Sequence, residues 1–232
     1  AFGDRGGIRP SKATLEAEDV EATTLGAKTN LDRHIRNMAS FGVPVVVSIN
    51  RFASDTDAEL AAITQAAHES GASAVCLTEV HANGGEGGKD LAEAVVKAVQ
   101  RHVAAGRPFV PLFTPETDVL EKANAIATRM YKAEGLELTT KAQRELDRIR
   151  SWGYGHLPVC MAKTQYSFSH DASLLGAPSG FTVPVREFRL NAGAGFVVAV
   201  LGDMMTMPGL PKRPAALDMD MDEDGNLLGV FG

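Results

Sequence analysis

The feature that most constrains the fold is a pair of uninterrupted apolar segments, each of strand length, with a helical segment between them. The first is Val43 to Phe52 (VPVVVSINRF), and the second opens the stretch Ala74 to Gly88 (AVCLTEVHANGGEGG). Continuous apolar runs rich in β-branched residues are typical of strands buried on both faces of a parallel sheet. Residues 54–71 have a helical period, with Ser54 or Asp55 available as the N-cap. The pattern predicts a βαβ unit with two interior strands.

A ligand site is expected where these two strands end, because open α/β sheets bind ligands beyond the carboxyl ends of their strands. The residues that follow the strands should line one crevice, and they are Asn50, Arg51, Phe52, Glu79, His81, Gly84, Gly85, Glu86 and Gly87. Phe52 and His81 hold matching places, and two facing rings can hold a flat heteroaromatic ligand. Ordinary packing within each loop is the commoner reason for such rings, and the pattern alone leaves both explanations open.

The charge and apolar content restrict the partners. The net charge is −6 and no cluster of Lys and Arg occurs, so we expect no nucleic-acid partner. No apolar stretch reaches the roughly 20 residues that span a bilayer, and no secretory signal opens the chain. Cys76 and Cys160 both lie in apolar runs, which is typical of buried, reduced thiols in a cytoplasmic protein.

The chain of 232 residues can form two modest domains. We expect an α/β protein in which a Rossmann-like parallel-sheet domain is followed by a smaller α+β domain. Residues 1–32 are expected to be a connector, residues 33–127 the Rossmann-like domain and residues 128–232 the α+β domain, because the pattern becomes shorter and alternating after about residue 128.

Several elements can be placed within these domains. Thr29 should cap the helix that precedes the first strand, and the helix after Gly88 should present Leu91, Val95, Val99 and Val103 as one apolar face. Two helices joined by a turn at Gly135 are expected further on, at residues 119–131 and 141–152. Residues 157–169 should form a strand that leads into a polar loop, and two more strands are expected at residues 182–190 and 195–202. Residues 107–113 contain Pro111 and fit an edge strand or an extended linker.

Two motifs suggest ion or phosphate binding and neither is complete. The stretch Gly84 to Asp90 lies between a strand and a helix, as a phosphate loop does, but Asn83 and Asp90 stand where a P-loop needs Gly and Ser or Thr. A loop whose bare backbone approaches a ligand is favoured, with a simple turn as the alternative. The acidic residues 218–225 imitate the first half of an EF-hand without its second half, so an acidic hairpin turn is expected and no metal site.

Five long strings together resemble the C-terminal part of the formyltetrahydrofolate synthetases, also called formate–tetrahydrofolate ligases. They are FGVPVVVSINRFASDTDAE, GGEGGKDLA, LPVCMAKTQYSFS, GAGFVVAVLGDMMTMPGLPKRPAA and DGNLLGVF. The likeness covers essentially everything after about residue 28. Long, unusual strings in the order of the family are far more specific than any one glycine motif.

The resemblance implies a ligase of one-carbon metabolism. Such an enzyme uses ATP with Mg²⁺ to convert formate into formyl phosphate, whose carbonyl is then attacked by N10 of tetrahydrofolate. It also implies a cytoplasmic homotetramer, with formate, tetrahydrofolate and ATP as its small-molecule substrates. A monovalent cation, K⁺ or NH₄⁺, is implied as a further cofactor.

The resemblance also implies roles for individual residues. In the family an aromatic residue of N-R-F and a tryptophan before the glycine-rich loop hold the pterin, and these positions are Phe52 and His81 here. Their neighbours in the crevice become folate-binding candidates, and Leu77 corresponds to the leucine that lies against the adenine. His81 departs from the family, because it is a smaller ring than tryptophan.

The catalytic residues are expected outside this chain. The family places its P-loop lysine, and the arginine that grips formyl phosphate, in an N-terminal domain that these 232 residues lack. The chain alone is therefore expected to be inactive. A non-enzymatic module that binds folate or joins the ligase assembly is the alternative, and a nucleotide hydrolase built on the Gly84 loop is a third, remote one.

Overall fold

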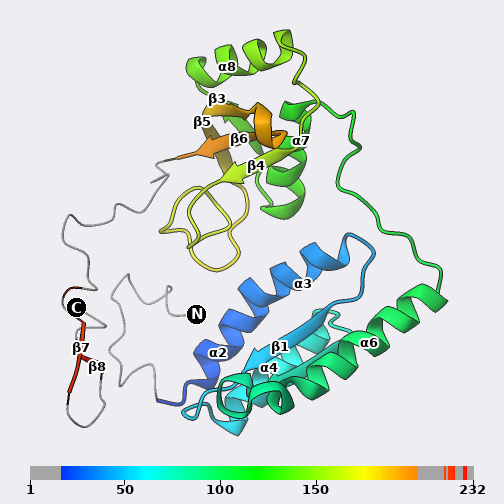
Figure 1. Ribbon diagram of the computed structural model, residues 1–232, viewed down its shortest axis with the longest axis vertical. Helices are drawn as coiled ribbons and strands as arrows, with labels where there is room; N and C mark the ends of the chain where they lie inside the picture. Colours follow the sequence, from blue (N-terminus) through cyan, green and yellow to red (C-terminus); the bar gives the residue numbers. More distant parts are fainter. Residues whose placement is uncertain (1–16, 203–216, 218, 223–226, 229–232) are drawn as a thin grey trace. The chain divides into compact units, whose positions relative to one another are not determined.

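The computed structural model describes residues 17–202, 217, 219–222 and 227–228. The chain divides into two units, residues 1–202 and residues 203–232, each of which is described by itself. The helical elements (Figure 1) are α2 Val20–Gly26, η2 Ala27–Leu31, α3 Asp32–Ala39, α4 Asp57–Glu69, α5 Val80–Asn83, η3 Gly84–Gly88, α6 Lys89–Ala104, α7 Val119–Ala125, η4 Ile126–Met130, α8 Thr140–Ser151 and η5 Ala192–Ala194. The strands are β1 Val46–Asn50, β2 Ala74–Thr78, β3 Gly135–Leu138, β4 Val159–Ala162, β5 Thr182–Asn191, β6 Phe196–Leu201, β7 Asp220–Met221 and β8 Leu227–Leu228.

The predicted βαβ unit is present. Strands β1 and β2 are parallel, in a register that runs from Val46 opposite Ala74 to Asn50 opposite Thr78, and α4 connects them. The N-cap of α4 is Thr56, which forms a capping box with Glu59, so the assignment of the cap to Ser54 or Asp55 is wrong. The Asp55 carboxylate instead accepts a hydrogen bond from the backbone N–H of Phe52, at 2.8 Å.

The expectation that β1 and β2 are interior strands is wrong for this chain. Within the described residues the sheet has two strands, so each has a single neighbour. Its small core consists of Ile35, Ala67 and Ala72, with half-buried Val47 and Val75 packed against them. Apolar runs show that a strand has apolar surroundings, but they cannot show which chain segment supplies the neighbour.

The first helix begins earlier than expected. It runs from Val20 to Ala39 with a π-helical segment at residues 27–31, and its N-cap is Asp19, whose carboxylate accepts a hydrogen bond from the N–H of Ala22. Thr29 lies inside the helix and donates its hydroxyl to the carbonyl of Leu25 at 2.8 Å. The backbone N–H of Asp19 donates to the Glu59 carboxylate at 2.9 Å, a contact between distant residues that no local pattern reveals.

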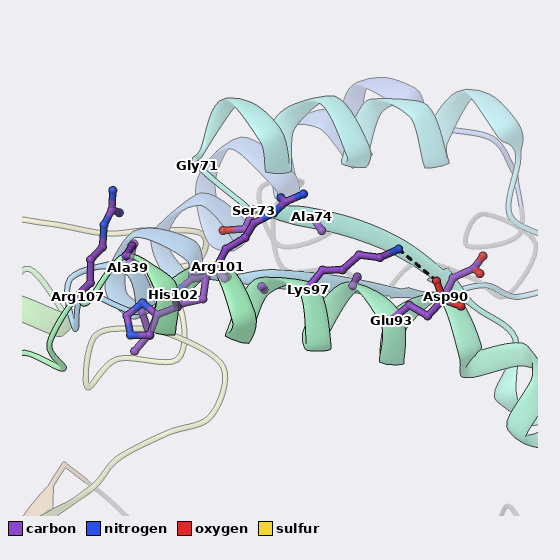
Figure 2. Close-up of a pocket in the computed structure, with 17 residues that line it drawn as sticks. Ala39, Gly71, Ser73, Ala74, Asp90, Glu93, Lys97, Arg101, His102 and Arg107 are labelled. Carbon is purple, nitrogen blue, oxygen red and sulfur yellow. Dashed lines mark hydrogen bonds and ion pairs between the residues drawn. The ribbon is translucent and has the colours of Figure 1, made fainter.

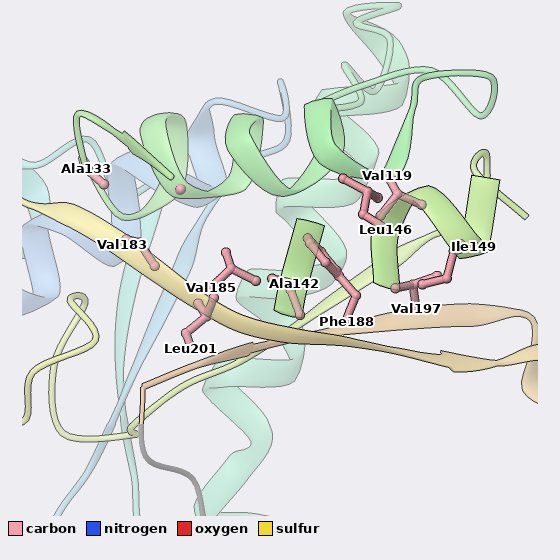
Figure 3. Packing of buried hydrophobic residues seen from close by; sticks show 12 residues of the cluster. Val119, Ala133, Ala142, Leu146, Ile149, Val183, Val185, Phe188, Val197 and Leu201 are labelled. Atoms are coloured by element: carbon pink, nitrogen blue, oxygen red, sulfur yellow. The ribbon is translucent and has the colours of Figure 1, made fainter. Parts of the chain in front are cut away.

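The second sheet contains four strands in the order β3-β5-β6-β4. The β3–β5 and β4–β6 pairs are parallel and the β5–β6 pair is antiparallel, so the sheet is mixed. Helix α8 packs on it, and Figure 3 shows the apolar core between them. The fully or almost fully buried members of this core include Leu146, Ile149, Val183, Val185, Val197 and Leu201.

For this region one prediction is wrong, one of two alternatives is favoured and one prediction is confirmed. The expected turn at Gly135 is the start of β3, which pairs with β5, and a strand of four residues is too short for a clear period-2 pattern. Residues 107–113 form no strand, which favours the linker. Strand β6 is buried as expected.

A buried lysine connects the loop that precedes α7 with the loop that precedes β4. Lys122 on α7 is 1% exposed, and its ammonium donates hydrogen bonds to the backbone carbonyls of Pro115, at 2.7 Å, and His156. The carbonyl of Leu157 lies at 3.5 Å, and the ring of Phe113 is 5.7 Å away from the ammonium. Burial lowers the pKa of Lys122, and the carbonyls supply the hydrogen bonds that a buried ammonium requires.

The predicted face of α6 is not buried. Val95 is 43% exposed, Val99 52% and Val103 70%, whereas the neighbouring Ala98 is buried.

The prediction of buried thiols is wrong for Cys160, which is exposed, while Cys76 is half-buried. The alternating faces of a short strand explain the exposure of Cys160, because a shift of one residue moves a side chain from the core to the surface.

The second unit contributes the antiparallel pair of β7 and β8, with Asp220 opposite Leu228. This pairing agrees with the expected hairpin, but its tip at residues 223–226 lies outside the described residues. No helix in the described part of the chain is long and apolar enough to cross a membrane.

Candidate ligand site at the carboxyl ends of β1 and β2

The register of β1 and β2 brings the predicted site residues to one edge of the sheet. Asn50 lies opposite Thr78, and the N–H of Arg51 donates to the carbonyl of Thr78 at 3.0 Å. The Thr78 side chain is buried and its hydroxyl donates to the carbonyl of Ile49 at 3.2 Å. The two chain segments that leave this edge therefore start side by side, one toward Phe52 and the other toward residue 81.

A tight turn holds Phe52 at this edge. The N–H of Phe52 donates to the Asp55 carboxylate, and the N–H of Asp55 donates back to the carbonyl of Phe52 at 3.1 Å. The ring projects from the turn and is 63% exposed. Arg51 forms an exposed ion pair with Asp57 at 3.4 Å. An exposed aromatic side chain on a fastened turn is available to a ligand without a large rearrangement.

His81 reaches the same edge on the single-turn helix α5. Its segment is closed by the N–H of Glu79, which donates to the carbonyl of Gly87 at 3.0 Å, and by Asn83, which donates to the Glu79 carboxylate at 3.4 Å. His81 is exposed. The ring pairs in contact among the described residues do not include Phe52 or His81, so the two rings are not stacked on each other.

The glycines of the η3 loop have three different environments. A Cβ on Gly87 would lie 2.5 Å from the Glu79 carbonyl group, and Gly84 has a φ of +56°, so both positions require glycine for structural reasons. Gly85 has no positive φ, and a Cβ there would meet nothing within 4 Å. Gly85 is thus a glycine that the fold itself does not require, and a Cβ on Gly88 would also make only an ordinary contact, at 3.4 Å from the Val80 side chain.

Carboxylates surround the start of α6. Gly88 is its N-cap and makes no side-chain cap, while Glu86 precedes it and Asp90 lies in its first turn. Lys89 is 3.7 Å from the Glu86 carboxylate. Negative side chains at a helix N-terminus oppose the binding of a phosphate there. Within residues 17–202 and the described parts of the tail, no three His, Cys, Asp or Glu side chains are grouped as metal ligands.

Glu59 is a site-supporting residue that the sequence did not indicate. Its carboxylate accepts hydrogen bonds from the N–H of Asp19, from the N–H and hydroxyl of Thr56, and from the hydroxyl of Thr23. These hydrogen bonds, led by that from Asp19, lower the pKa of Glu59. Glu59 therefore fastens the start of α2 to the end of the turn that carries Phe52. The signal available in the sequence was the capping-box pattern Thr56-x-x-Glu59, but the expected N-cap was Ser54 or Asp55.

Leu77 lies one residue before the end of β2, opposite Ile49. It is 42% exposed, although it belongs to an apolar strand. An exposed leucine near the carboxyl end of β2 can contact the flat face of a ring bound there.

A groove of about 880 Å³ begins at the amino ends of β1 and β2 and runs along α6, and Figure 2 shows the side chains that line it. None of the predicted site residues lies in it. Lys97 in the groove is paired with Glu93 at 3.2 Å, and Arg101 and His102 lie in the last turn of α6, where cations offset the helix dipole. The groove therefore needs no ligand to explain its charges.

Comparison with known proteins places these observations in a family. Residues 1–231 match the family model described as formate–tetrahydrofolate ligase. The formate–tetrahydrofolate ligases of Paracoccus denitrificans and Roseobacter denitrificans are 49% and 50% identical to the chain, each over 226 residues that make up 97% of it. The chain spans 39% of the length of each of these two relatives.

Proposed function

The chain belongs to the formate–tetrahydrofolate ligase family, and we propose that it forms the folate-side portion of such a ligase, which makes 10-formyltetrahydrofolate. The observation that carries this proposal is the parallel register of β1 and β2, which delivers two exposed rings to one edge of the sheet. The family's pterin-holding positions coincide with these rings, at Phe52 and His81.

The pterin would lie between Phe52 and His81. Aromatic contacts of this kind favour a flat ring over flexible competitors and fix its orientation. Asn50 and Arg51 would offer polar contacts, the backbone of residues 84–87 would approach the ligand at Gly85, and the adenine of the nucleotide would lie against Leu77. Holding tetrahydrofolate in one orientation directs its N10 toward the formyl group, and such orientation is a large part of what an enzyme adds to an acyl transfer.

ATP with Mg²⁺ would supply the phosphate that turns formate into a good acylating agent, as formyl phosphate. The described residues do not fit the triphosphate, because the helix start that could cradle it is flanked by Glu86 and Asp90. We therefore assign the phosphate chemistry to the part of the ligase outside this chain. The proposal includes a cytoplasmic homotetramer, a monovalent cation (K⁺ or NH₄⁺) and the division into residues 1–32, 33–127 and 128–232.

A non-enzymatic module that binds folate or assembles with the ligase remains the second candidate, since the same lack of fit for the triphosphate favours it. Release of ADP from the purified chain with formate, tetrahydrofolate and Mg-ATP separates the possibilities. We expect none from the chain alone, and turnover that survives repurification would contradict the assignment of the phosphate chemistry. A full-length ligase that contains these residues should release ADP if the chain is the enzyme's folate-side portion.

Titration with folic acid, an unreactive analogue, tests the site. Phe52→Ala should weaken binding by about 1 to 3 kcal/mol, the scale of a lost aromatic contact at a recognition site. Phe109→Ala is the matched control, because Phe109 is 60% exposed and its ring stacks on Phe41, which precedes β1, at the opposite end of that strand from the proposed site. His81→Trp should tighten binding, because indole offers a larger apolar face. Equal affinities of Phe52→Ala and the unmodified chain would refute the pterin site.

A further inference from the structure

One face of α6 is apolar and uncovered. It consists of Ala92, Val95, Val96, Val99 and Val103, the valine face, and the four valines are 43–70% exposed. At 100° per residue these five side chains lie within a sector of about 100°, the width of the stripe that a surface helix turns toward a core. No Lys, Arg, Asp or Glu of α6 falls in this sector. Helix α6 therefore has the apolar face of a helix that packs on a core, and within the described residues this face is exposed.

The surroundings of the valine face are also incomplete. Strands β1 and β2 form a two-stranded parallel sheet within the described residues, whereas parallel sheets are normally larger and covered on both faces. The groove of about 880 Å³ lies on the other side of α6, along Ala94, Ala98 and Ala105. A helix that packs on a two-stranded sheet with one face and leaves the valine face exposed is typical of a layer that continues into another chain segment.

We propose that the valine face is the docking surface for the part of the ligase polypeptide outside these 232 residues. The inference rests on family membership. The chain covers 39% of the length of its relatives, so more than half of each relative is available to supply the missing neighbour. The occupant is an apolar helix or strand face of the same polypeptide, since a charge-free surface offers nothing to a charged partner.

The size of the face favours a linked segment over a second copy of the chain. Helix α6 has 16 residues, so it is about 24 Å long and about 10 Å wide, and one face of it provides a few hundred Å². A stable interface between separate molecules needs about 800 Å² from each partner. A segment in the same polypeptide is held at high effective concentration, so it can dock on a smaller area.

A chimeric ligase tests the proposal, with these 232 residues in place of the matching region of the Paracoccus denitrificans ligase. Val99→Lys should lower the melting temperature of the chimera by at least about 3 °C and speed hydrogen exchange in α6 at least about ten-fold, because the lysine would be buried in the interface. Gln100→Lys is the matched control, because this exposed neighbour points about 100° away and should change neither quantity. Equal behaviour of the two variants would overturn the proposal.

The isolated chain gives a second, independent measurement. Neither variant should change its melting temperature or its sedimentation, because Val99 is already exposed to water there. If the isolated chain instead forms dimers that Val99→Lys abolishes and Gln100→Lys does not, the occupant is a second copy and the proposal is wrong. Folic acid affinity is read from the same samples, so failure of the docking surface and failure of the pterin site are separate results.

Discussion

The two sheets of the first unit are built from similar apolar sequence but differ in how far they bury it. The four-stranded sheet has a core of twelve buried residues that includes Leu146 and Val197 at 0% exposure. The two-stranded sheet has a core of three, Ile35, Ala67 and Ala72, and its longest helix leaves four valines 43–70% exposed. The four-stranded sheet and its core, the closed region, are stabilised by the chain's own residues, whereas the two-stranded sheet and α6, the open region, leave apolar side chains and the rings of Phe52 and His81 exposed.

The difference teaches that apolar pattern and burial are separate properties. Hydrophobic stabilisation scales with the apolar area removed from water, so a valine on α6 contributes little to this chain although its pattern is that of a core residue. The same valine contributes in full once a neighbour covers it. Stability of the two regions should therefore respond very differently to the same kind of substitution.

The largest expected effect is in the closed sheet. Leu146→Ala removes a fully buried side chain and should destabilise the chain by about 2–5 kcal/mol. Val103→Ala on α6, which is 70% exposed, should change the free energy of unfolding by less than about 0.5 kcal/mol. Urea unfolding of both variants measures the contrast. A similar loss in the two variants would show that α6 is covered in solution.

A smaller effect is expected within the open region, where the glycine loop meets the end of β2. Gly87→Ala places a Cβ 2.5 Å from the Glu79 carbonyl group and should cost about 1–3 kcal/mol through overpacking. Gly85→Ala should leave stability unchanged, because a Cβ there meets nothing within 4 Å, but it should weaken folic acid binding if the proposed ligand approaches the backbone at this position. If Gly85→Ala binds folic acid normally, the loop is a simple turn.

The next effect is the loss of stability at acid pH that the ion pair between Asp118 and Arg150 should produce. In the closed region, hydrogen bonds from Arg150, at 2.6 and 3.0 Å, lower the pKa of Asp118 below its ordinary value of 3.8. Because the folded-state pKa is the lower one, the stabilisation is present above pH 3.8 and is lost as the pH falls through the folded value.

Asp118→Asn isolates this contribution, since asparagine retains the N-cap of α7. The substitution should cost about 1 kcal/mol at pH 7, and the difference from the unmodified chain should shrink below pH 3. Urea unfolding across pH 2.5–7 provides the measurement. Glu59→Gln is the equivalent substitution in the open region. If the destabilisation caused by either substitution does not change with pH, the negative charge of that side chain does not contribute to stability.

The smallest effect on stability is expected at the turn that carries Phe52. Asp55→Ala removes the acceptor of the Phe52 N–H, but that N–H is near water, so the cost should stay below about 0.5 kcal/mol. Folic acid affinity should nevertheless fall a few-fold, because the ring loses its fixed position. An unchanged affinity would indicate that the turn keeps the Phe52 ring in place without the Asp55 carboxylate.

The sequence predicted the elements whose patterns are local. The parallel pair β1–β2, helix α8 and the buried strand β6 all appear where expected, because each has a long apolar period of its own. The βαβ pattern also predicted that the segments carrying Phe52 and His81 leave the same carboxyl edge, as the register of β1 and β2 shows. That these two residues form one site and bind folate stays a prediction.

What the sequence could not predict depends on contacts between distant residues. The early start of α2 depends on a hydrogen bond from Asp19 to Glu59, and strand β3 exists because residues 135–138 pair with β5. The exposure of the valine face was not predictable either, because the periodicity of Val95, Val99 and Val103 indicates an apolar face but not whether the described chain covers it.

Lys122 has a consequence for how the closed region responds to solution conditions. Its ammonium is held by backbone carbonyls of two separate loops, the same ligands that proteins use for a bound potassium ion. Here the cation is covalently attached, so the two loops are joined at every potassium concentration, and dialysis cannot remove the charge that joins them. Monovalent cations of the solvent therefore have no vacant set of carbonyls to occupy between these two loops.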